Sequence, residues 1–333
     1  DNNTAVGHSA LKVNTTGTCN IAMGVNALTA NTTGNNNVAI GFCANATAVD
    51  RNDNTAIGFE ALKLNTAVGN TAVGKAAADS NTTAEGITAI GNRALCSNTT
   101  GANNTAVGLC AMRTSTTGAN NTSMGMCSLF ANTTGEQNTA VGVCSLNANT
   151  TGSRNVAFGR HALDTNVSGN SNTAIGDQSL FANTASNNTA LGFYSMASNT
   201  SGSCNTGLGQ NALTANTTGV TNTAVGKDTL QANTTASANT AVGTNALKTT
   251  TTGAENTAVG VGALDVNTAS YNTAMGVDAG GSNTSGTGNV FMGNAAGGAN
   301  TTASNNTAIG KDALTTNTTG TDNVALGFCA LNA

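Results

Sequence analysis

The chain has no proline and no tryptophan, and only 8% of its 333 residues are charged. Because proline cannot donate to a β ladder, its absence suits a fold in which nearly every backbone N–H is paired. Eleven scattered Lys and Arg residues do not make the clustered basic surface of a nucleic-acid binder. No apolar run approaches about 18 residues, so the sequence predicts no membrane insertion.

Residue types for catalysis and cofactor binding are also scarce. The two histidines, His8 and His161, are far apart in the sequence, and no phosphate-binding glycine motif lies between a strand and a helix. Aspartate is too sparse to supply the regular ligands of a calcium-binding solenoid. We therefore expect no enzyme activity, no catalytic residues, no cofactor and no metal site.

What the chain has in abundance is repetition. The sequence Asn-Thr-Ala-Val-Gly of residues 256–260 recurs in close variants twenty times, and the intervals between motif glycines are 17 residues in sixteen cases and 16 in three. A fixed short period of this kind is the signature of stacked repeats that bury one another's faces. Because no linker interrupts the repeat, we predict one all-β domain over residues 1–333, a rod-like parallel β-solenoid of about twenty coils. The predicted corner glycines include Gly7, Gly24, Gly108, Gly142, Gly226, Gly260 and Gly327.

Positions are counted from the motif glycine of each coil. Position −1 is apolar in all twenty coils, position −2 is Ala in 17, and position −3 is Thr, Val or Ile, which is typical of a strand. Position +3 is small and position +4 is Leu in 14 coils, so each coil is predicted to hold two short strands and two turns. Phe291 replaces an Ala at −2 where Gly280 and Gly297 replace Leu at +4, which predicts that these two columns share one compartment.

Asparagine forms two further columns. Position −4 is Asn in 19 coils, and stacked Asn side chains can form hydrogen-bonded ladders along the axis. The first column includes Asn3, Asn20, Asn104, Asn138 and Asn256. Asn at +7 opens the turn Asn-Thr-Thr-Gly, in which we expect the glycine to adopt a positive φ. The same Asn residues are glycosylation sequons, so glycans and bare ladders are alternatives at Asn14, Asn31, Asn98, Asn132, Asn149, Asn216, Asn233 and Asn317.

Two constrained faces suggest that one chain is incomplete. Neighbouring strand residues point to opposite faces, yet positions −1 and −2 are both restricted in type. One face can line the coil, and the other is most simply covered by a second copy, so we expect a homo-oligomer or an end-to-end filament. The alternative is a coil bent sharply enough to turn both columns inward.

Several side chains carry alternatives that the sequence leaves open. Cys110, Cys127 and Cys144 stack at position +2 and are either free thiols or bridged. A file of Thr at +8 resembles an ice-binding surface. Exposed Phe residues directly after the motif glycine are either incidental or contacts for a receptor or partner chain.

The pattern Asn-x-Ala-(Val/Ile)-Gly-x-x-Ala, carried for example by Ala140, Val141 and Gly142, is similar to the head repeat of YadA-like trimeric autotransporter adhesins. It also resembles repeats in tail-fibre-like proteins of phages and large viruses. The resemblance covers nearly the whole chain and implies a left-handed trimeric β-roll. The expected function is a non-enzymatic fibre or adhesin shaft on a cell or virion surface, part of a longer fibre or its mature product. Its variable turns would face a host receptor, a glycan or a neighbouring filament.

Overall fold

The computed structural model describes residues 2–332, which contain twenty strands of three residues each and no helix. The chain divides into two compact units, Asp1–Asn170 and Ser171–Ala333, and each is a parallel β-solenoid. The first unit contains β1 (Thr4–Val6), β2 (Ile21–Met23), β3 (Val38–Ile40), β4 (Thr55–Ile57), β5 (Thr71–Val73), β6 (Thr88–Ile90), β7 (Thr105–Val107), β8 (Thr122–Met124), β9 (Thr139–Val141) and β10 (Val156–Phe158). The second contains β11 (Thr173–Ile175), β12 (Thr189–Leu191), β13 (Thr206–Leu208), β14 (Thr223–Val225), β15 (Thr240–Val242), β16 (Thr257–Val259), β17 (Thr273–Met275), β18 (Val290–Met292), β19 (Thr307–Ile309) and β20 (Val324–Leu326).

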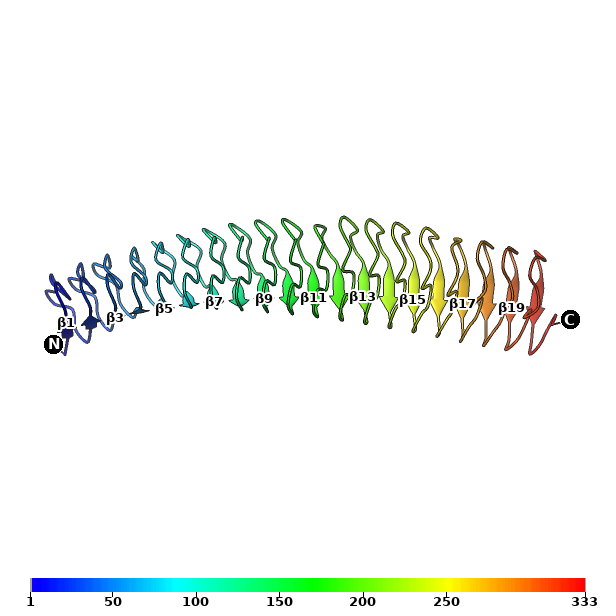
Figure 1. The fold of residues 1–333 in the computed structure, drawn as a ribbon, viewed down its shortest axis with the longest axis horizontal. Coiled ribbons are helices and arrows are strands. Elements are labelled where there is room, and N and C mark those ends of the chain that lie inside the picture. Colours follow the sequence, from blue (N-terminus) through cyan, green and yellow to red (C-terminus); the bar gives the residue numbers. More distant parts are fainter. Residues whose placement is uncertain (1, 333) are drawn as a thin grey trace. The chain divides into compact units, whose positions relative to one another are not determined.

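Within each unit every strand pairs in parallel with the strand of the next coil, as the file of arrows in Figure 1 shows. The register places equivalent positions of successive coils side by side, so that Ala140 lies beside Ala157 and Val141 lies beside Phe158. The predicted fold class, an all-β parallel solenoid, is confirmed. The strands follow from a β-branched residue at −3 and an apolar residue at −1, both of which favour an extended backbone.

The predicted second strand does not form. After the motif glycine the backbone alternates in φ, and positions +2 and +4 are left-handed, as in Cys127 (φ 54°) and Leu129 (φ 50°). The backbone N–H groups still bond between coils: that of Leu129 donates to the carbonyl of Ser145 at 2.8 Å. This left-handed turn brings both the +3 and the +4 side chains inward, so the alternative of a sharp bend is correct for this half of the coil.

The interior is a thin layer of small residues and leucines. Ala140 at −2 and Leu146 at +4 are both fully buried, and the apolar side chains at −1 lie outside. Phe291 tests whether the −2 and +4 columns share this space. A Cβ added to Gly280 would lie 2.5 Å from Cδ2 of Phe291, and one added to Gly297 would collide with the same ring. The prediction of one shared compartment is therefore confirmed.

Two sets of glycines lie at corners of the coil, and different constraints act on each. Gly142 has φ 128°, and a Cβ there would lie 2.6 Å from the carbonyl oxygen of Gly159 in the next coil. Gly135 closes an Asn-Thr-Thr-Gly turn but is not among the residues with positive φ, so the prediction for this turn is wrong. Its Cβ would collide with the carbonyl of Gly152, so close stacking rather than backbone conformation favours glycine there. Other coils place Ala84, Ala236 and Ala303 at this position.

The three 16-residue coils shorten at the same place. A regular coil reads Asn-Thr-Thr-Gly from +7, and a short coil reads Asn-Thr-Ala. In the short coils the +7 amide bonds to the carbonyl two residues on, as Asn65 does to Ala67 at 3.0 Å; in a regular coil Asn98 reaches Gly101, three residues on. The residue removed is the exposed Thr at +9, so every inward column keeps its register.

Candidate functional site

The Asn column at −4 fastens each coil to its neighbours. The side-chain oxygen of Asn121 accepts from the backbone N–H of Asn138 at 2.9 Å, and the Asn138 amide donates to the carbonyl of Gly152 at 2.8 Å. Asn20, Asn104 and Asn256 are fully buried members of the same column, and Asn3 begins it at the half-buried end. Their amides satisfy backbone groups that would otherwise be unpaired inside the coil.

The Asn column at +7 is a second ladder with a fixed direction. The Asn149 amide donates to the side-chain oxygen of Asn132 in the preceding coil at 2.9 Å and to the carbonyl of Gly152 at 2.9 Å. The ladder breaks where another residue takes the position: at Ala48, Ser115 and Thr250. In the described part of the chain, the buried oxygens just before these breaks have no hydrogen-bond partner; they belong to Asn31, Asn98 and Asn233.

The same geometry bears on the glycosylation sequons. Six of the eight Asn side chains are fully buried: Asn31, Asn98, Asn132, Asn149, Asn216 and Asn233. The half-buried Asn14 and Asn317 also use their amide nitrogens within the fold, donating to Gly17 and Gly320. The structure favours the bare ladder, and a glycan at these positions requires modification before the coil closes.

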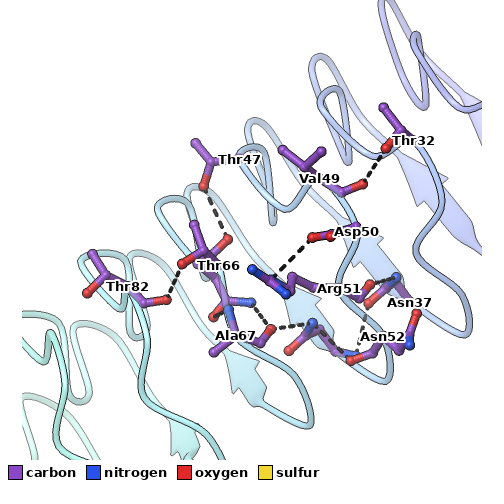
Figure 2. A network of polar contacts seen from close by, with 12 residues as sticks. Thr32, Asn37, Thr47, Val49, Asp50, Arg51, Asn52, Thr66, Ala67 and Thr82 are labelled. Atoms are coloured by element: carbon purple, nitrogen blue, oxygen red, sulfur yellow. Dashed lines mark hydrogen bonds and ion pairs between the residues drawn. The ribbon is translucent and has the colours of Figure 1, made fainter.

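The coil that follows Gly41 carries a charged turn, Ala48-Val49-Asp50-Arg51, where regular coils have Asn-Thr-Thr-Gly (Figure 2). Its backbone carbonyls accept the same hydrogen bonds as those of regular coils: Val49 accepts from the Thr32 hydroxyl at 3.0 Å, and Arg51 from the Asn37 amide at 2.7 Å. The pair between Arg51 and Asp50, at 3.4 Å, is exposed and contributes little to stability. The coil therefore keeps its place through the backbone, and its charged side chains remain at the surface.

The Thr file at +8 is also part of the framework. The hydroxyl of Thr116 donates to the carbonyl of Thr133 at 3.1 Å, and that of Thr133 donates to Thr150 at 3.0 Å. These hydroxyl protons are used in hydrogen bonds along the axis, to the carbonyl of the next coil. The ice-binding alternative gains no support from this arrangement.

An apolar surface follows the outer side of the strands. We call it the apolar stripe: the side chains at −1 together with the apolar ones at +1, beside the glycine column. Many are about half exposed, as Met124 (46%) and Phe158 (55%) are. Its most exposed members in the first unit are Val6, Met23, Val25, Phe42, Ile57, Phe59, Ile90, Leu109, Met124, Met126, Val143 and Phe158. In the second they are Ile175, Leu191, Phe193, Val261, Met275, Val277, Ile309, Leu326 and Phe328.

Aromatic residues concentrate this surface in places. The rings of Phe42 and Phe59, on successive coils, stack with centroids 5.2 Å apart, and the ammonium of Lys75 lies 5.9 Å from the centre of the Phe59 ring. Phe193 meets Tyr194 edge to face at 4.3 Å. These rings are exposed side chains held in fixed positions, which suits contact with another surface.

Ionisable groups do not assemble into a metal or catalytic centre. Across residues 2–332, no three His, Cys, Asp or Glu side chains are placed to hold one metal ion. All eight cysteines are free thiols. No helix in this range is long and apolar enough to cross a membrane.

Sequence reasoning missed the breaks in the +7 ladder, although the signal was present: three non-Asn residues interrupt an Asn column. It found the outer apolar column and could not say which of the two strand faces lay outside. The structure assigns Ala to the inside and the larger residues to the outside. No family model matches the chain, and no curated protein matches it.

Proposed function

We propose that the chain is a non-enzymatic structural fibre or adhesin shaft that works as a homo-oligomer, with a trimer favoured, on a cell or virion surface. The solenoid supports a mechanical role because, within each unit, backbone ladders, Asn ladders and a shared core join each coil to its neighbours. The exposed turns vary in sequence from coil to coil, and they are the parts available to a host receptor, a glycan or a neighbouring filament.

The apolar stripe is the observation that carries the proposal. Soluble monomers rarely expose large contiguous apolar patches, and those that exist usually mark contact sites. Each unit has a large apolar side chain at −1 on every coil, and burial returns about 25 cal/mol for each Å² removed from water. Summed over many coils, that gain favours covering the stripe.

A second copy of the chain matches the stripe best. Its exposed side chains recur at the coil spacing, roughly 4.8 Å. A second solenoid with the same repeat length can contact each coil through an equivalent coil of its own. A partner without this repeat cannot. Repetition therefore favours self-association along the stripe over binding of an unrelated globular partner.

Light scattering on the purified full chain tests the proposal. We expect a mass that is a multiple of 32.5 kDa, with three chains favoured. Met124→Lys combined with Val141→Lys places two charges in the stripe and should reduce the mass to that of one chain while the circular dichroism spectrum stays unchanged. Thr117→Lys with Thr134→Lys adds the same charge at exposed turn positions and should leave the assembly intact. A monodisperse monomer of the unmodified chain would overturn the proposal.

A further inference from the structure

Three cysteines form a regular file in the first unit. Cys110, Cys127 and Cys144 occupy position +2 of successive coils, with φ values of 56°, 54° and 55°. Their backbones bond identically: Cys127 donates to Leu109 and Cys144 donates to Met126, both at 3.0 Å. Equal backbone conformation and equal pairing point the three Cα–Cβ bonds the same way, one coil apart.

The thiols are accessible and near one another. Each is half-buried, between the exposed +1 side chains and the buried residues at +3. Burial raises the pKa of Cys127 and of Cys144, and the second cause in each case is the neighbouring thiol, Cys110 for the first and Cys127 for the second. The thiols are thus partly shielded from water, and they influence one another's ionisation.

The spacing of the file suits a bridging ion better than a disulfide. Sulfurs stacked in parallel are separated by about one coil, roughly 4.8 Å. A disulfide bond is only about 2.05 Å long, so the coils or side chains would have to move together. A thiolate bond to a closed-shell metal ion is about 2.3 Å, so an ion midway between two sulfurs spans about 4.6 Å.

We propose that Cys110, Cys127 and Cys144 form a site for soft monovalent metal ions of the Cu(I) class, with one ion between each neighbouring pair. Thiolate sulfur is the ligand type that selects such ions. Three thiols and two ions give a chain in which Cys127 bridges both metals and the outer cysteines bind one each. The three thiols release three protons, no electron is transferred, and the loaded file carries one negative charge. Each ion needs only two ligands, which is consistent with the lack of three ligands around one point.

The chain contains its own control for position. Cys43 also lies at +2, with φ 52°, but its neighbours in that column are Asn26 and Glu60. The Asn26 amide lies 4.0 Å from its sulfur. Cys43 therefore offers the same exposure and backbone without a second thiol, and we expect it to hold no bridged ion.

Native mass spectrometry of the reduced full chain, titrated with Ag(I) under argon in excess 2-mercaptoethanol, tests the site. The competing thiol removes singly bound ions, so two ions per chain should remain. Cys127→Ser should retain none, because Cys110 and Cys144 are two coils apart. Cys110→Ser and Cys144→Ser should each retain one, and Cys43→Ser should retain both.

Other patterns overturn the proposal. Equal losses for all four variants would mean independent thiols, and no retained ion in the unmodified chain would mean that the file does not bridge metal. Circular dichroism of each variant checks that the coil remains folded.

Discussion

The two sides of each strand obey different rules. The inner position −2 is nearly always Ala and is buried in every coil but the first, while the outer position −1 accepts Val, Ile, Leu, Met or Phe and stays at least partly exposed. Inside, the space between the layers fixes the volume, because protein interiors are close-packed. At position −1, only the apolar character is constant. The contrast teaches that the inner position is restricted in side-chain volume, whereas the outer position −1 is restricted only in polarity.

The strongest test of this contrast compares a Phe→Ala substitution at an inner position with one at an outer position. Phe291→Ala removes the largest inner side chain and should lower the free energy of unfolding by about 3–5 kcal/mol. The facing residues, Gly280 and Gly297, have no side chains that could fill the cavity. Phe158→Ala on the outside should change stability by about 0.5 kcal/mol or less. Urea denaturation at low protein concentration, where self-association does not contribute, measures both.

The loss at Phe291 should also be reversible. Adding Gly280→Leu and Gly297→Leu to Phe291→Ala restores the regular pattern, and both glycines already have the left-handed φ, 59° and 62°, that Leu adopts in other coils. If the triple variant is no more stable than Phe291→Ala, the two columns do not exchange volume as inferred.

A smaller effect is expected when volume is added. Ala140→Leu should cost about 1–3 kcal/mol by overpacking the inner layer. Val141→Leu, one residue along on the outer side, should leave the unfolding midpoint nearly unchanged. Equal effects at the two positions would contradict the assignment of inside and outside.

Completing the +7 ladder should stabilise the first unit by about 1 kcal/mol, the usual net contribution of a buried hydrogen bond. Ser115→Asn supplies a donor for the unpartnered oxygen of Asn98 and an acceptor for the Asn132 amide. Thr117→Asn, at the exposed corner of the same coil, is the control and should have no effect. Thermal or urea unfolding of the two variants compares them directly.

The smallest expected effect is electrostatic. Burial raises the pKa of Asp265, and one of its buried oxygens has no partner among the described residues. A raised folded pKa means that the ionised form destabilises the fold, so this contribution to stability improves as pH falls through that pKa. Asp265→Asn should therefore be more stable than the unmodified chain at pH 7, and the difference should shrink toward pH 4.

Asp228 should show the opposite sign. A hydrogen bond from Asn211, at 2.9 Å, lowers the pKa of its carboxyl group. The resulting stabilisation is present above the ordinary carboxyl pKa and is lost as pH falls through the lowered value. Asp228→Asn should be the less stable chain at pH 7, and urea midpoints of both variants across this range distinguish the two carboxylates.

Much of the fold could be predicted from columns of residues. The strand, its register, the Asn ladders and the compartment shared by Phe291 and its glycines all follow from side-chain volume and polarity. The left-handed turn could not, because residues such as Leu129 and Cys127 normally avoid positive φ, and only the stacked hydrogen bonds of neighbouring coils stabilise it there. This conformation therefore depends on hydrogen bonds between neighbouring coils and is not expected in an isolated coil.

The sequence predicted that position −1 is apolar in every coil, but it did not predict that these side chains lie on the outer surface. Sequence alternation showed that Val141 and Ala140 point to different sides, but either side could have been the interior. The left-handed turn decides the question by directing Leu146 toward Ala140.

The shortened coils locate the tolerance of this architecture to changes in length. Residues 67, 185 and 269 each follow a Thr where regular coils have one residue more, and the inner columns continue undisturbed. A corner that accepts deletion without a shift in register is also the natural place for insertion. Peptides grafted at this corner would be displayed at regular intervals of one coil. The solenoid could therefore hold ligands at a fixed, known spacing.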